Sequence, residues 1–364
     1  MENVGGVSGP ALQNAEMNVG IIGTGWPGQQ HAIALSSSKR GRLHSCADLD
    51  EQRRAAFVKE FGPDMAVGDY HEMLADAAVD AVMICLPNYL HFPASLAALE
   101  AGKHVFCEKP PTLNAAEMKV LRDQASERGL VYFFGRQFRF TPGMLAAKRL
   151  IAEGRLGNIY HARATWMRSR GIPPGIGGWF TEKKRSGGGA LIDIGVHALD
   201  SVWYLMGNPR PVSASAGVFQ NFAHFVASAV FDVEDAAYAF IRFENGAVVH
   251  LETCWAGNLP DEIPEGKYFG RETNNSLLFG TKGTLRLKPL TLFEDQNGAL
   301  VTVPIKNGSV EDNADSFAAQ LDNFLAAIAG ESEPINSAEQ AVELMGMIDA
   351  IYASGAAGRE MAIA

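Results

Sequence analysis

Lys109 stands at the end of a short apolar segment and is followed by a proline. The stretch Ala81–Pro110 predicts a strand at 81–86, a helix at 92–100 and a second strand at 104–107. Parallel strands joined by a helix end at the same edge of their sheet, where open α/β sheets bind ligands. We therefore expect the Lys109 amine to be held at a ligand site. There it would stabilise negative charge developing on a substrate oxygen.

A glycine-rich turn follows the apolar segment 17–22 and leads into a helical segment that runs to about residue 35. The turn reads G-x-G-x-x-G and consists of Gly23, Gly25, Trp26, Pro27 and Gly28 with Thr24. Glycines allow the tight turn and let the backbone approach a pyrophosphate, whose charge the helix N-terminus favours. This context predicts a dinucleotide site.

Asp48 ends the next predicted strand, 43–47, and lies 20 residues beyond the last glycine of the turn. A carboxylate at this position accepts hydrogen bonds from both ribose hydroxyls of an adenosine and repels a 2′-phosphate. The sequence therefore predicts NAD as the cofactor, with NADP disfavoured. A plain cap at the strand end is the alternative role for Asp48.

Asp193 and His197 are four residues apart in the segment 190–206, which is predicted to be helical. Four residues are about one helical turn, so both side chains should project from one face into one pocket. An imidazole with a pKa of about 6.5 is suited to take the proton of an alcohol near neutral pH. Asp193 would then orient the imidazole or a substrate hydroxyl. Alternatively, His197 is an interior histidine paired with Asp193, and Lys109 is a solvated strand-end lysine.

Strands and helices alternate up to about residue 135, which predicts a doubly wound parallel sheet over residues 17–137. Residues 1–16 are read as a disordered tail. From 138 to 364 the pattern changes, and strands are predicted at 159–167, 211–219, 235–243, 247–255 and 276–287. Helices are expected at 144–153, 190–206, 316–329 and 337–353. Strands in succession indicate a largely antiparallel sheet, so the fold class is α/β with two domains.

Composition excludes several classes of partner. The 364 residues carry 31 basic and 41 acidic side chains, a net charge of −10, so we expect no nucleic acid binding. No apolar segment reaches the roughly 20 residues that a membrane span needs, and the start of the chain has no signal-peptide pattern. The four cysteines are dispersed without a C-x-x-C pair, which predicts no metal site and a reducing, cytoplasmic location.

The chain resembles the glucose-fructose oxidoreductase/inositol dehydrogenase (Gfo/Idh/MocA) family over about residues 17–360. Besides the glycine turn, the matching motifs are P-N-x-x-H at 87–91, A-G-K-H-V-x-x-E-K-P at 101–110 and G-G-x-L-x-D-x-G-x-H within 187–200. The resemblance implies a Rossmann domain followed by an α/β domain whose open, mostly antiparallel sheet often forms a homodimer or homotetramer interface. It also implies NAD-dependent hydride transfer at a secondary hydroxyl of a pyranose, glycoside or cyclitol, or at the corresponding ketone.

The resemblance also implies roles for individual residues. It implies catalytic roles for Lys109, Asp193 and His197. Its implied cofactor contacts are Leu86, Pro87, Asn88, His91, Glu108, Lys109 and Gln137. Gln137 departs mildly from the family, because many relatives carry Asn or His there. His91 could equally be a polar cap at the start of its helix.

Substrate contacts are expected mainly from the segment 165–180, TWMRSRGIPPGIGGWF. The candidates are Arg139, Trp166, Arg168, Arg170 and Trp179, together with Asp193 and His197. Aromatic faces stack on pyranose rings, and a guanidinium can fork onto hydroxyls or a carboxylate. The alternatives place Trp166 in the sheet core and the arginines on the surface. The polar loop 261–271 could close over the site or serve a neighbouring subunit.

Two other functions stay open. In the first, transient oxidation of a sugar acidifies the neighbouring carbon and breaks a glycosidic bond, with the cofactor regenerated in each turnover. In the second, the protein is a nucleotide-binding sensor without turnover, although a sensor has no need of Lys109, Asp193 and His197 together. Release of an aglycone without net NADH would indicate the first, and tight NAD binding without turnover would indicate the second.

Overall fold

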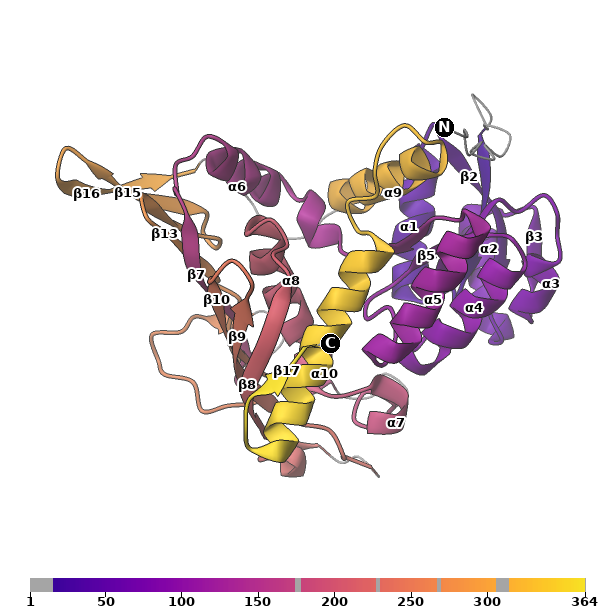
Figure 1. Ribbon diagram of the computed structural model, residues 1–364. Coiled ribbons are helices and arrows are strands. Elements are labelled where there is room, and N and C mark those ends of the chain that lie inside the picture. Colours follow the sequence, from indigo (N-terminus) through magenta and orange to yellow (C-terminus); the bar gives the residue numbers. More distant parts are fainter. Residues whose placement is uncertain (1–15, 174–177, 227–229, 267–269, 306–313, 364) are drawn as a thin grey trace, which may run out of the picture.

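The computed structural model describes residues 16–173, 178–226, 230–266, 270–305 and 314–363. Two sheets lie side by side, with helices between and around them (Figure 1). The predicted N-terminal tail falls almost wholly outside the described residues, as do parts of the loops 171–178 and 261–271. Among the described helices, none is long and apolar enough to cross a membrane.

The first sheet has six parallel strands in the order β3-β2-β1-β4-β5-β6. The strands are β1 Met17–Ile22, β2 Gly41–Ala47, β3 Met65–Val67, β4 Ala81–Ile84, β5 His104–Cys107 and β6 Tyr132–Phe134. The connecting helices are α1 Trp26–Ser37, α2 Glu51–Phe61, α3 Tyr70–Leu74, α4 His91–Glu100 and α5 Ala115–Arg128. The predicted doubly wound parallel sheet is confirmed. Its strand order reverses between β1 and β4, and a ligand crevice is expected outside the carboxyl ends of these strands.

Local sequence determines where helix α2, which packs beside this sheet, begins and ends. The Asp50 side chain caps α2 by accepting hydrogen bonds from the backbone N–H groups of Gln52 and Arg53. Gly62 ends the same helix in the left-handed conformation, which glycine adopts without steric cost. These caps hold α2 beside the carboxyl end of β2, where Asp48 lies.

The second sheet is mixed and mostly antiparallel, as predicted. Its main path runs β16-β15-β14-β13-β7-β10-β9-β8-β17, and in that path only the β7/β10 pair is parallel. The strands are β7 Ile159–Arg168, β8 Pro211–Phe219, β9 Ala236–Phe243, β10 Val248–Cys254, β11 Glu265–Gly266, β12 Gly270–Thr273, β13 Leu277–Gly280, β14 Gly283–Arg286, β15 Thr291–Gln296, β16 Ala299–Pro304 and β17 Met361–Ala362.

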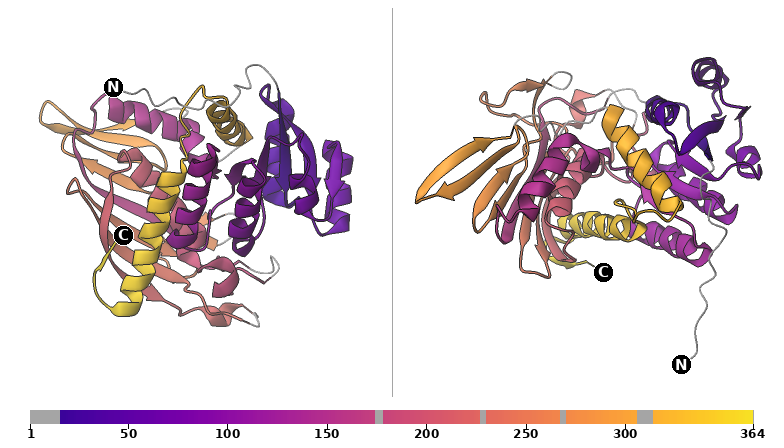
Figure 2. Two further views of the ribbon diagram at one scale, coloured as in Figure 1. Left: turned by 45° about the vertical axis from the view of Figure 1, so that its right-hand side comes forward. Right: turned by 90° about the horizontal axis from the view of Figure 1, so that it is seen from above.

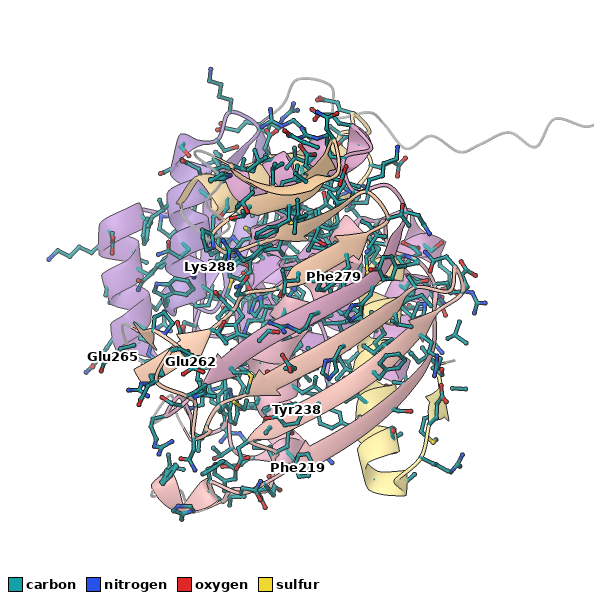
Figure 3. All side chains as sticks on the ribbon, turned by 90° about the vertical axis from the view of Figure 1, so that its left-hand side faces the viewer. Phe219, Tyr238, Glu262, Glu265, Phe279 and Lys288 are labelled. Carbon is teal, nitrogen blue, oxygen red and sulfur yellow. The ribbon has the colours of Figure 1, made fainter. Side chains whose placement is uncertain are left out.

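In the part of the chain that the structure describes, α-helices cover one face of this sheet. α8 Val196–Leu205 and α10 Ala338–Ala357 lie against it, α6 Pro142–Ala152 packs beside α8, and α10 also packs against α5 of the first unit (Figures 1 and 2). Across the opposite face, no α-helix of the described residues is seen (Figure 3). The predicted open sheet is therefore confirmed.

Two predicted elements are wrong in detail. The strand expected at 276–287 is a hairpin of β13 and β14, because the chain turns at Thr281 and Lys282. The helix expected at 190–206 begins with a π-helical turn, Leu191–Gly195, before α8.

The helix α9 Ala314–Ile328 returns to the first unit. Its side chains Phe317, Leu321 and Phe324 join the core around Val19 and Phe106, and the helix packs against α1. The expected division of the chain at 137/138 therefore does not account for α9, and that boundary stays a prediction.

Candidate active site

A cavity of about 770 Å³ opens at the carboxyl ends of β1, β4 and β5. Its wall combines residues from the first sheet with residues from the second half of the chain. The lining residues are Thr24, Gly25, Trp26, Pro27, Gln29, Arg53, Ala56, Cys85, Leu86, Pro87, Asn88, Glu108, Lys109, Pro110, Gln137, Trp179, Phe180, Asp193 and Phe317. The cavity lies at the point in the fold where a ligand is expected.

The glycine turn forms one end of this cavity. Gly23 has φ +96°, and a Cβ there would lie 2.4 Å from the Cys85 carbonyl oxygen. A Cβ on Gly28 would lie 2.2 Å from the Gly23 oxygen, so these two glycines serve close packing. Gly25 differs, because a Cβ there would meet only Pro27 Cδ at 3.9 Å. Gly25 thus keeps the cavity open just before the first residue of α1, at the end of the helix that favours an anion.

The Asp48 carboxylate supports the turn. Its Oδ2 accepts hydrogen bonds from the Thr24 N–H at 2.8 Å and the Thr24 hydroxyl at 2.7 Å, and Oδ1 accepts one from the Asp50 N–H at 2.9 Å. Thr24 and Arg53 line the cavity, whereas Asp48 is not among its lining residues. The geometry therefore agrees with the capping alternative, and a contact of Asp48 with a ribose stays a prediction.

Lys109 meets Asp193 across the two halves of the chain. The Lys109 Nζ donates to Asp193 Oδ1 at 3.1 Å and to the Asp193 carbonyl oxygen at 3.2 Å. The other carboxylate oxygen, Oδ2, accepts a hydrogen bond from Trp255 Nε1 at 3.0 Å. Both side chains line the cavity. An amine and a carboxylate are thus fixed together at a cavity wall.

The Glu108 side chain, which also follows strand β5, is held by His31 and by the backbone of Lys109. Its Oε1 lies 2.7 Å from His31 Nε2, and its Oε2 accepts from the Lys109 N–H at 3.2 Å. Burial raises the pKa of Glu108, but the contacts with His31 and Lys109 together outweigh it and leave that pKa below the ordinary value. The His31 ring packs edge-on against Phe106 and Phe317. His31 therefore packs in the core and also anchors a cavity-lining carboxylate.

The residues of the segment 86–91 have two different roles. Leu86, Pro87 and Asn88 line the cavity, and Asn88 Nδ2 donates to the Ser186 carbonyl at 2.8 Å. His91 is 1% exposed and lines neither of the cavities described. Its ring nitrogens lie 2.6 Å from the Pro110 oxygen and 2.7 Å from the Leu86 oxygen, so it ties two strand-end loops together. Burial lowers the pKa of His91. The expected cofactor contact of His91 does not fit this buried position.

His197 faces a second, much smaller cavity of about 30 Å³. This cavity is lined by Phe138, Met144, Thr165, Trp166, His197, Ala198, Ser201, Asn274, Ser276 and Leu287. Asp193 and His197 line different cavities, although the charge of Lys109, which bonds to Asp193, helps to lower the pKa of His197. The expectation that they point into one pocket stays a prediction.

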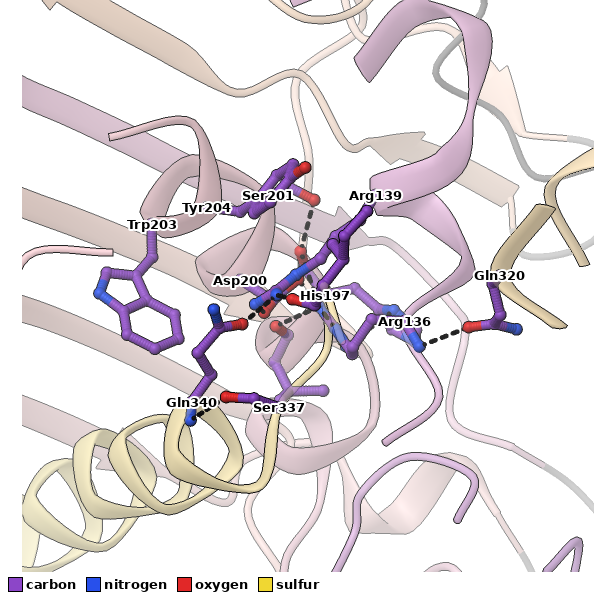
Figure 4. Close-up of polar contacts among 12 residues, drawn as sticks. Arg136, Arg139, His197, Asp200, Ser201, Trp203, Tyr204, Gln320, Ser337 and Gln340 are labelled. Carbon is purple, nitrogen blue, oxygen red and sulfur yellow. Dashed lines mark hydrogen bonds and ion pairs between the residues drawn. The ribbon is translucent and has the colours of Figure 1, made fainter. Parts of the chain in front are cut away.

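A buried ion network lies beside His197 (Figure 4). Arg136 Nη1 lies 3.2 Å from His197 Nδ1, and Arg136 Nε lies 3.0 Å from Asp200 Oδ2. Arg139 donates from Nη2 to Asp200 Oδ1 at 2.5 Å and from Nε to Oδ2 at 3.0 Å. Burial, together with the positive charges of Lys109, Arg136 and Arg168, holds the pKa of His197 well below its usual value.

The two tryptophans predicted to contact substrate line different cavities. Trp179 lines the large cavity and stacks on Phe180 with ring centroids 4.0 Å apart, and Trp166 lines the small one. Arg168 lies over the Trp166 ring at 5.4 Å, with its Nε 3.2 Å from Glu272 Oε2. Its placement beside a cavity-lining tryptophan is compatible with the predicted role.

Arg139 and Arg170 do not fit the substrate role. Arg139 is 1% exposed, and its guanidinium is bound by Asp200, the Ile335 carbonyl and Gln340. Arg170 is exposed, donates to the Gly257 carbonyl at 3.0 Å and faces the Phe225 ring. Neither lines either cavity.

Several residues at the site were not predicted from the sequence. Arg136 and Trp255 bond directly to His197 and Asp193, and Phe317 arrives from α9, far along the chain. The sequence signal for Arg136 was a pair of arginines three residues apart in a mostly apolar segment, 131–140. Such a pair indicates buried ion partners but does not identify them.

The sheet, the glycine turn and the amine at the cavity wall together define a dinucleotide-binding oxidoreductase. Residues 17–136 match the model for the oxidoreductase family with an NAD-binding Rossmann fold, and residues 144–286 match the GFO/IDH/MocA C-terminal domain. The chain belongs to the Gfo/Idh/MocA family of oxidoreductases.

Relatives with assigned activities resemble nearly the whole chain. It is 30% identical over 359 residues to the D-glucoside 3-dehydrogenase of Escherichia coli, covering 96% of this chain and 98% of that one. It is 28% identical to the NAD⁺-dependent scyllo-inositol 2-dehydrogenase of Bacillus subtilis, with 88% of each covered. A solved structure of levoglucosan dehydrogenase with NADH superposes with a TM-score of 0.83 at 24% identity, over 96% of this chain and all of that one. That likeness shows the shared fold.

Proposed function

We propose that this protein transfers hydride between NAD and a secondary hydroxyl of a pyranose, glycoside or cyclitol, or the corresponding ketone. The observation that carries this proposal is the contact of Lys109 Nζ with Asp193 Oδ1 in the wall of the cavity that begins at Gly25. It brings an amine and a carboxylate to the same cavity as the dinucleotide turn. The named activities of the relatives support the substrate class.

The cavity fits a dinucleotide. Gly25 leaves room where any side chain would project, and α1 begins directly after it with no acidic residue in its first turn. Both features suit a pyrophosphate at the helix N-terminus. When bound, the nicotinamide accepts or donates the hydride. The protein has to hold the sugar carbon against it.

Lys109 and Asp193 have separate tasks in this proposal. The amine donates a hydrogen bond to the reacting sugar oxygen and stabilises its negative charge, an effect that is strong where water is excluded. Asp193, fixed by Trp255, holds the amine in place. Trp179 offers a flat apolar face to the sugar ring.

Turnover on a defined panel tests the proposal. We expect NADH to form with at least one member of a set of monosaccharides, glycosides and inositols. Binding is measured separately as quenching of tryptophan emission, because Trp26 and Trp179 both line the cavity. If the protein neither bound NADH nor reduced NAD⁺ with any panel member, the proposal would fail.

Gly25→Ala should weaken NADH binding without affecting the fold. The backbone at Gly25 has φ −68° and ψ −171°, which alanine also adopts, so the free energy of unfolding should change by less than about 0.5 kcal/mol. The new methyl group projects into the cavity, and we expect NADH affinity to fall about tenfold or more. Titration and thermal melting measure the two effects. Gly28→Ala is the contrast, because its Cβ would collide with the Gly23 oxygen and should lower stability. Undiminished NADH affinity in Gly25→Ala would show that no pyrophosphate binds here.

Asp48→Ala should reduce the preference for NAD over NADP. Removing a carboxylate lifts its repulsion of a 2′-phosphate, and Arg53 in the same cavity wall could then pair with that phosphate. We expect the ratio of the two affinities to change by at least about tenfold. Thr24→Val is the matched control, because it removes the hydroxyl that bonds Asp48 but keeps the charge. An unchanged ratio in Asp48→Ala would mean that Asp48 serves only the turn.

The open face of the second sheet is proposed as an interface between copies of this chain. In β9, Ala237, Ala239 and Ile241 are buried under the helices, whereas Tyr238 and Phe240 alternate onto the open face. Figure 3 shows Tyr238 and Phe279 on that face. Apolar patches of this kind usually mark contact surfaces. Light scattering should give a dimer or tetramer for the native protein and a smaller species for Phe279→Glu; equal masses would contradict the proposal.

The cysteines support the proposed cytoplasmic location. All four thiols, of Cys46, Cys85, Cys107 and Cys254, are buried and free. Free thiols are typical of a reducing compartment. Localisation of a tagged full chain by fractionation would test this expectation.

A further inference from the structure

The start of the helix that carries Asp193 contacts a buried carboxylate. Three consecutive backbone N–H groups at this start donate to Glu234, and they belong to Gly189, Ala190 and Leu191. The Gly189 and Leu191 N–H groups reach Oε2 and Oε1 of the side chain, each at 2.9 Å, and the Ala190 N–H reaches the carbonyl oxygen at 3.3 Å. Glu234 thus satisfies donors that the first turn of a helix leaves without a partner inside the helix.

Tyr352 of α10 is a further donor to this carboxylate. Its hydroxyl donates to Glu234 Oε1 at 3.0 Å. Glu234 is 6% exposed, and this burial raises its pKa, although the N–H groups of Leu191 and Gly189 oppose the effect. A buried carboxylate costs free energy unless hydrogen bonds compensate it. Here that compensation comes from the helix start and from α10.

Two glycines allow the backbone to come this close. A Cβ on Gly189 would collide with the Glu234 carbonyl oxygen, and a Cβ on Gly188 would collide with the Tyr352 hydroxyl oxygen. Any other residue at these positions would push the chain away from the carboxylate. The glycine-rich segment that precedes the helix therefore serves the contact with Glu234 and Tyr352.

The helix start that Glu234 binds also determines the position of Asp193. The Asp193 N–H donates to the Gly189 carbonyl at 3.0 Å, so Asp193 lies in the first turn after the residues that contact Glu234. Trp255 Nε1 donates to Asp193 Oδ2 at 3.0 Å. The backbone N–H of Trp255 donates to the carbonyl of the residue after Glu234 at 2.8 Å. These two supports of Asp193 therefore depend on the same short stretch, 234–235.

We propose that Glu234 is a positioning residue for Asp193. By binding the start of the helix, its carboxylate holds the Asp193 side chain where Oδ1 contacts Lys109 Nζ at 3.1 Å. Tyr352 supports this role, because its hydroxyl fixes one of the two carboxylate oxygens. Glu234 does not line the large cavity, so it acts through Asp193 and not on a ligand bound there.

The consequence for catalysis rests on the proposed function. In that reaction Lys109 donates a hydrogen bond to the reacting sugar oxygen, and Asp193 holds the amine in place. A displacement of about 1 Å in such a group can cost about 10²-fold in rate. Loss of the Glu234 contacts should therefore lower kcat, whereas NADH binding at the glycine turn of the first sheet should change little.

The test is NMR of the indole N–H groups of the full-length protein, which has five tryptophans. The Trp255 signal reports on Asp193, because this indole donates to its carboxylate. It is assigned as the signal missing from Trp255→Phe, and Asp193→Ala gives its position without the bond. We expect Glu234→Gln to move the Trp255 signal toward that position and to speed its exchange with water. The measurement needs neither NAD nor a sugar, so its result is independent of the proposed function.

Matched variants separate this role from a general effect of substitution. Glu234→Gln keeps the size of the side chain, but an amide nitrogen cannot accept from a backbone N–H, so one contact with the helix is lost. Tyr352→Phe leaves both backbone contacts and should move the Trp255 signal in the same direction by a smaller amount. Glu244→Gln is the control, because this glutamate forms an exposed pair with Arg210, and its Trp255 signal should be native.

Two results of the NMR experiment would overturn the proposal. One is a native Trp255 signal in folded Glu234→Gln or, if that variant does not fold, a native signal in Tyr352→Phe. The other is a shift of equal size in Glu244→Gln, which would show a general response of the second sheet.

Kinetics with an active sugar give a second readout. Glu234→Gln should lower kcat by about 10- to 100-fold, while the affinity for NADH stays within about twofold of the native value. Equal losses in kcat and in NADH affinity would indicate a general loss of structure and contradict the proposal. A native protein that is inactive on every sugar would contradict the proposed function, whereas the position of Asp193 is decided by the NMR result alone.

Discussion

Replacing Lys109 with methionine lowers kcat/KM for the active sugar by about 10³-fold, with little change in NADH affinity, if the account is correct. Methionine keeps most of the apolar stem but removes the group that stabilises charge on the reacting oxygen. Loss of one such donor costs about 10² to 10³ in rate. Asp193 keeps its hydrogen bond from Trp255, so the carboxylate stays ordered.

Steady-state kinetics and NADH titration separate these two effects. Lys184→Met is a suitable control, since this lysine is exposed on the short helix α7 Lys183–Ser186 and lines neither cavity. It should behave like the native protein. Retention of more than a tenth of the native kcat/KM by Lys109→Met would exclude the amine from the chemical step.

Asp200→Asn should be the most destabilising single substitution at the site. Asp200 is fully buried and compensates both Arg136 and Arg139. Removing one partner of a buried ion pair costs about 3–5 kcal/mol, because the remaining charges are left uncompensated. We expect the melting temperature to fall by roughly 10 °C. Asp322→Asn is the control, because Asp322 forms an exposed pair with Arg40 that should contribute only about 0–1 kcal/mol.

The stability that Asp200→Asn loses depends on pH, because it follows from the pKa of Asp200. Burial would raise that pKa, but the charges of Arg136 and Arg139 prevail and lower it. A carboxyl whose folded pKa lies below its unfolded value stabilises the fold above the unfolded pKa of about 3.9. This contribution is lost as the pH falls through the folded pKa, so the native protein and Asp200→Asn should converge in acid. Melting temperatures of Asp200→Asn and Asp322→Asn that agree within error at neutral pH would contradict the assigned role.

The sequence predicted much of the fold because the apolar patterns are local. The alternation of strands and helices up to residue 135 and the successive strands after it lead to the two sheets that are seen. The pattern of α9 shows an apolar face at Phe317, Leu321 and Phe324, but no local pattern tells which sheet that face covers. The β13/β14 hairpin was missed, although Gly280 and Gly283 on either side of the turn are residues typical of turns.

The residues of the site were predicted less well than the fold. Motif residues on the first sheet, such as Gly25, Asn88 and Lys109, line the cavity because strand ends place them there. Arg139 was predicted to contact substrate but is paired with Asp200. A charged residue in an apolar segment is compatible with either role, and the sequence does not show the pairing because Asp200 is distant along the chain. The π-helical turn at Leu191–Gly195 was missed, because a spacing argument based on an α-helix cannot detect it.

Transfer of deuterium from substrate to cofactor tests the central claim most directly. The protein is incubated with NAD⁺ and sugars or cyclitols deuterated at a single ring carbon, and the nucleotide and sugar products are analysed by mass spectrometry. The account predicts one deuterium in the NADH for each ketone formed, from one ring position of at least one substrate, and almost none with Lys109→Met. Bound NADH that never acquires deuterium from any panel member, or a transfer that is equally fast without the Lys109 amine, would contradict it.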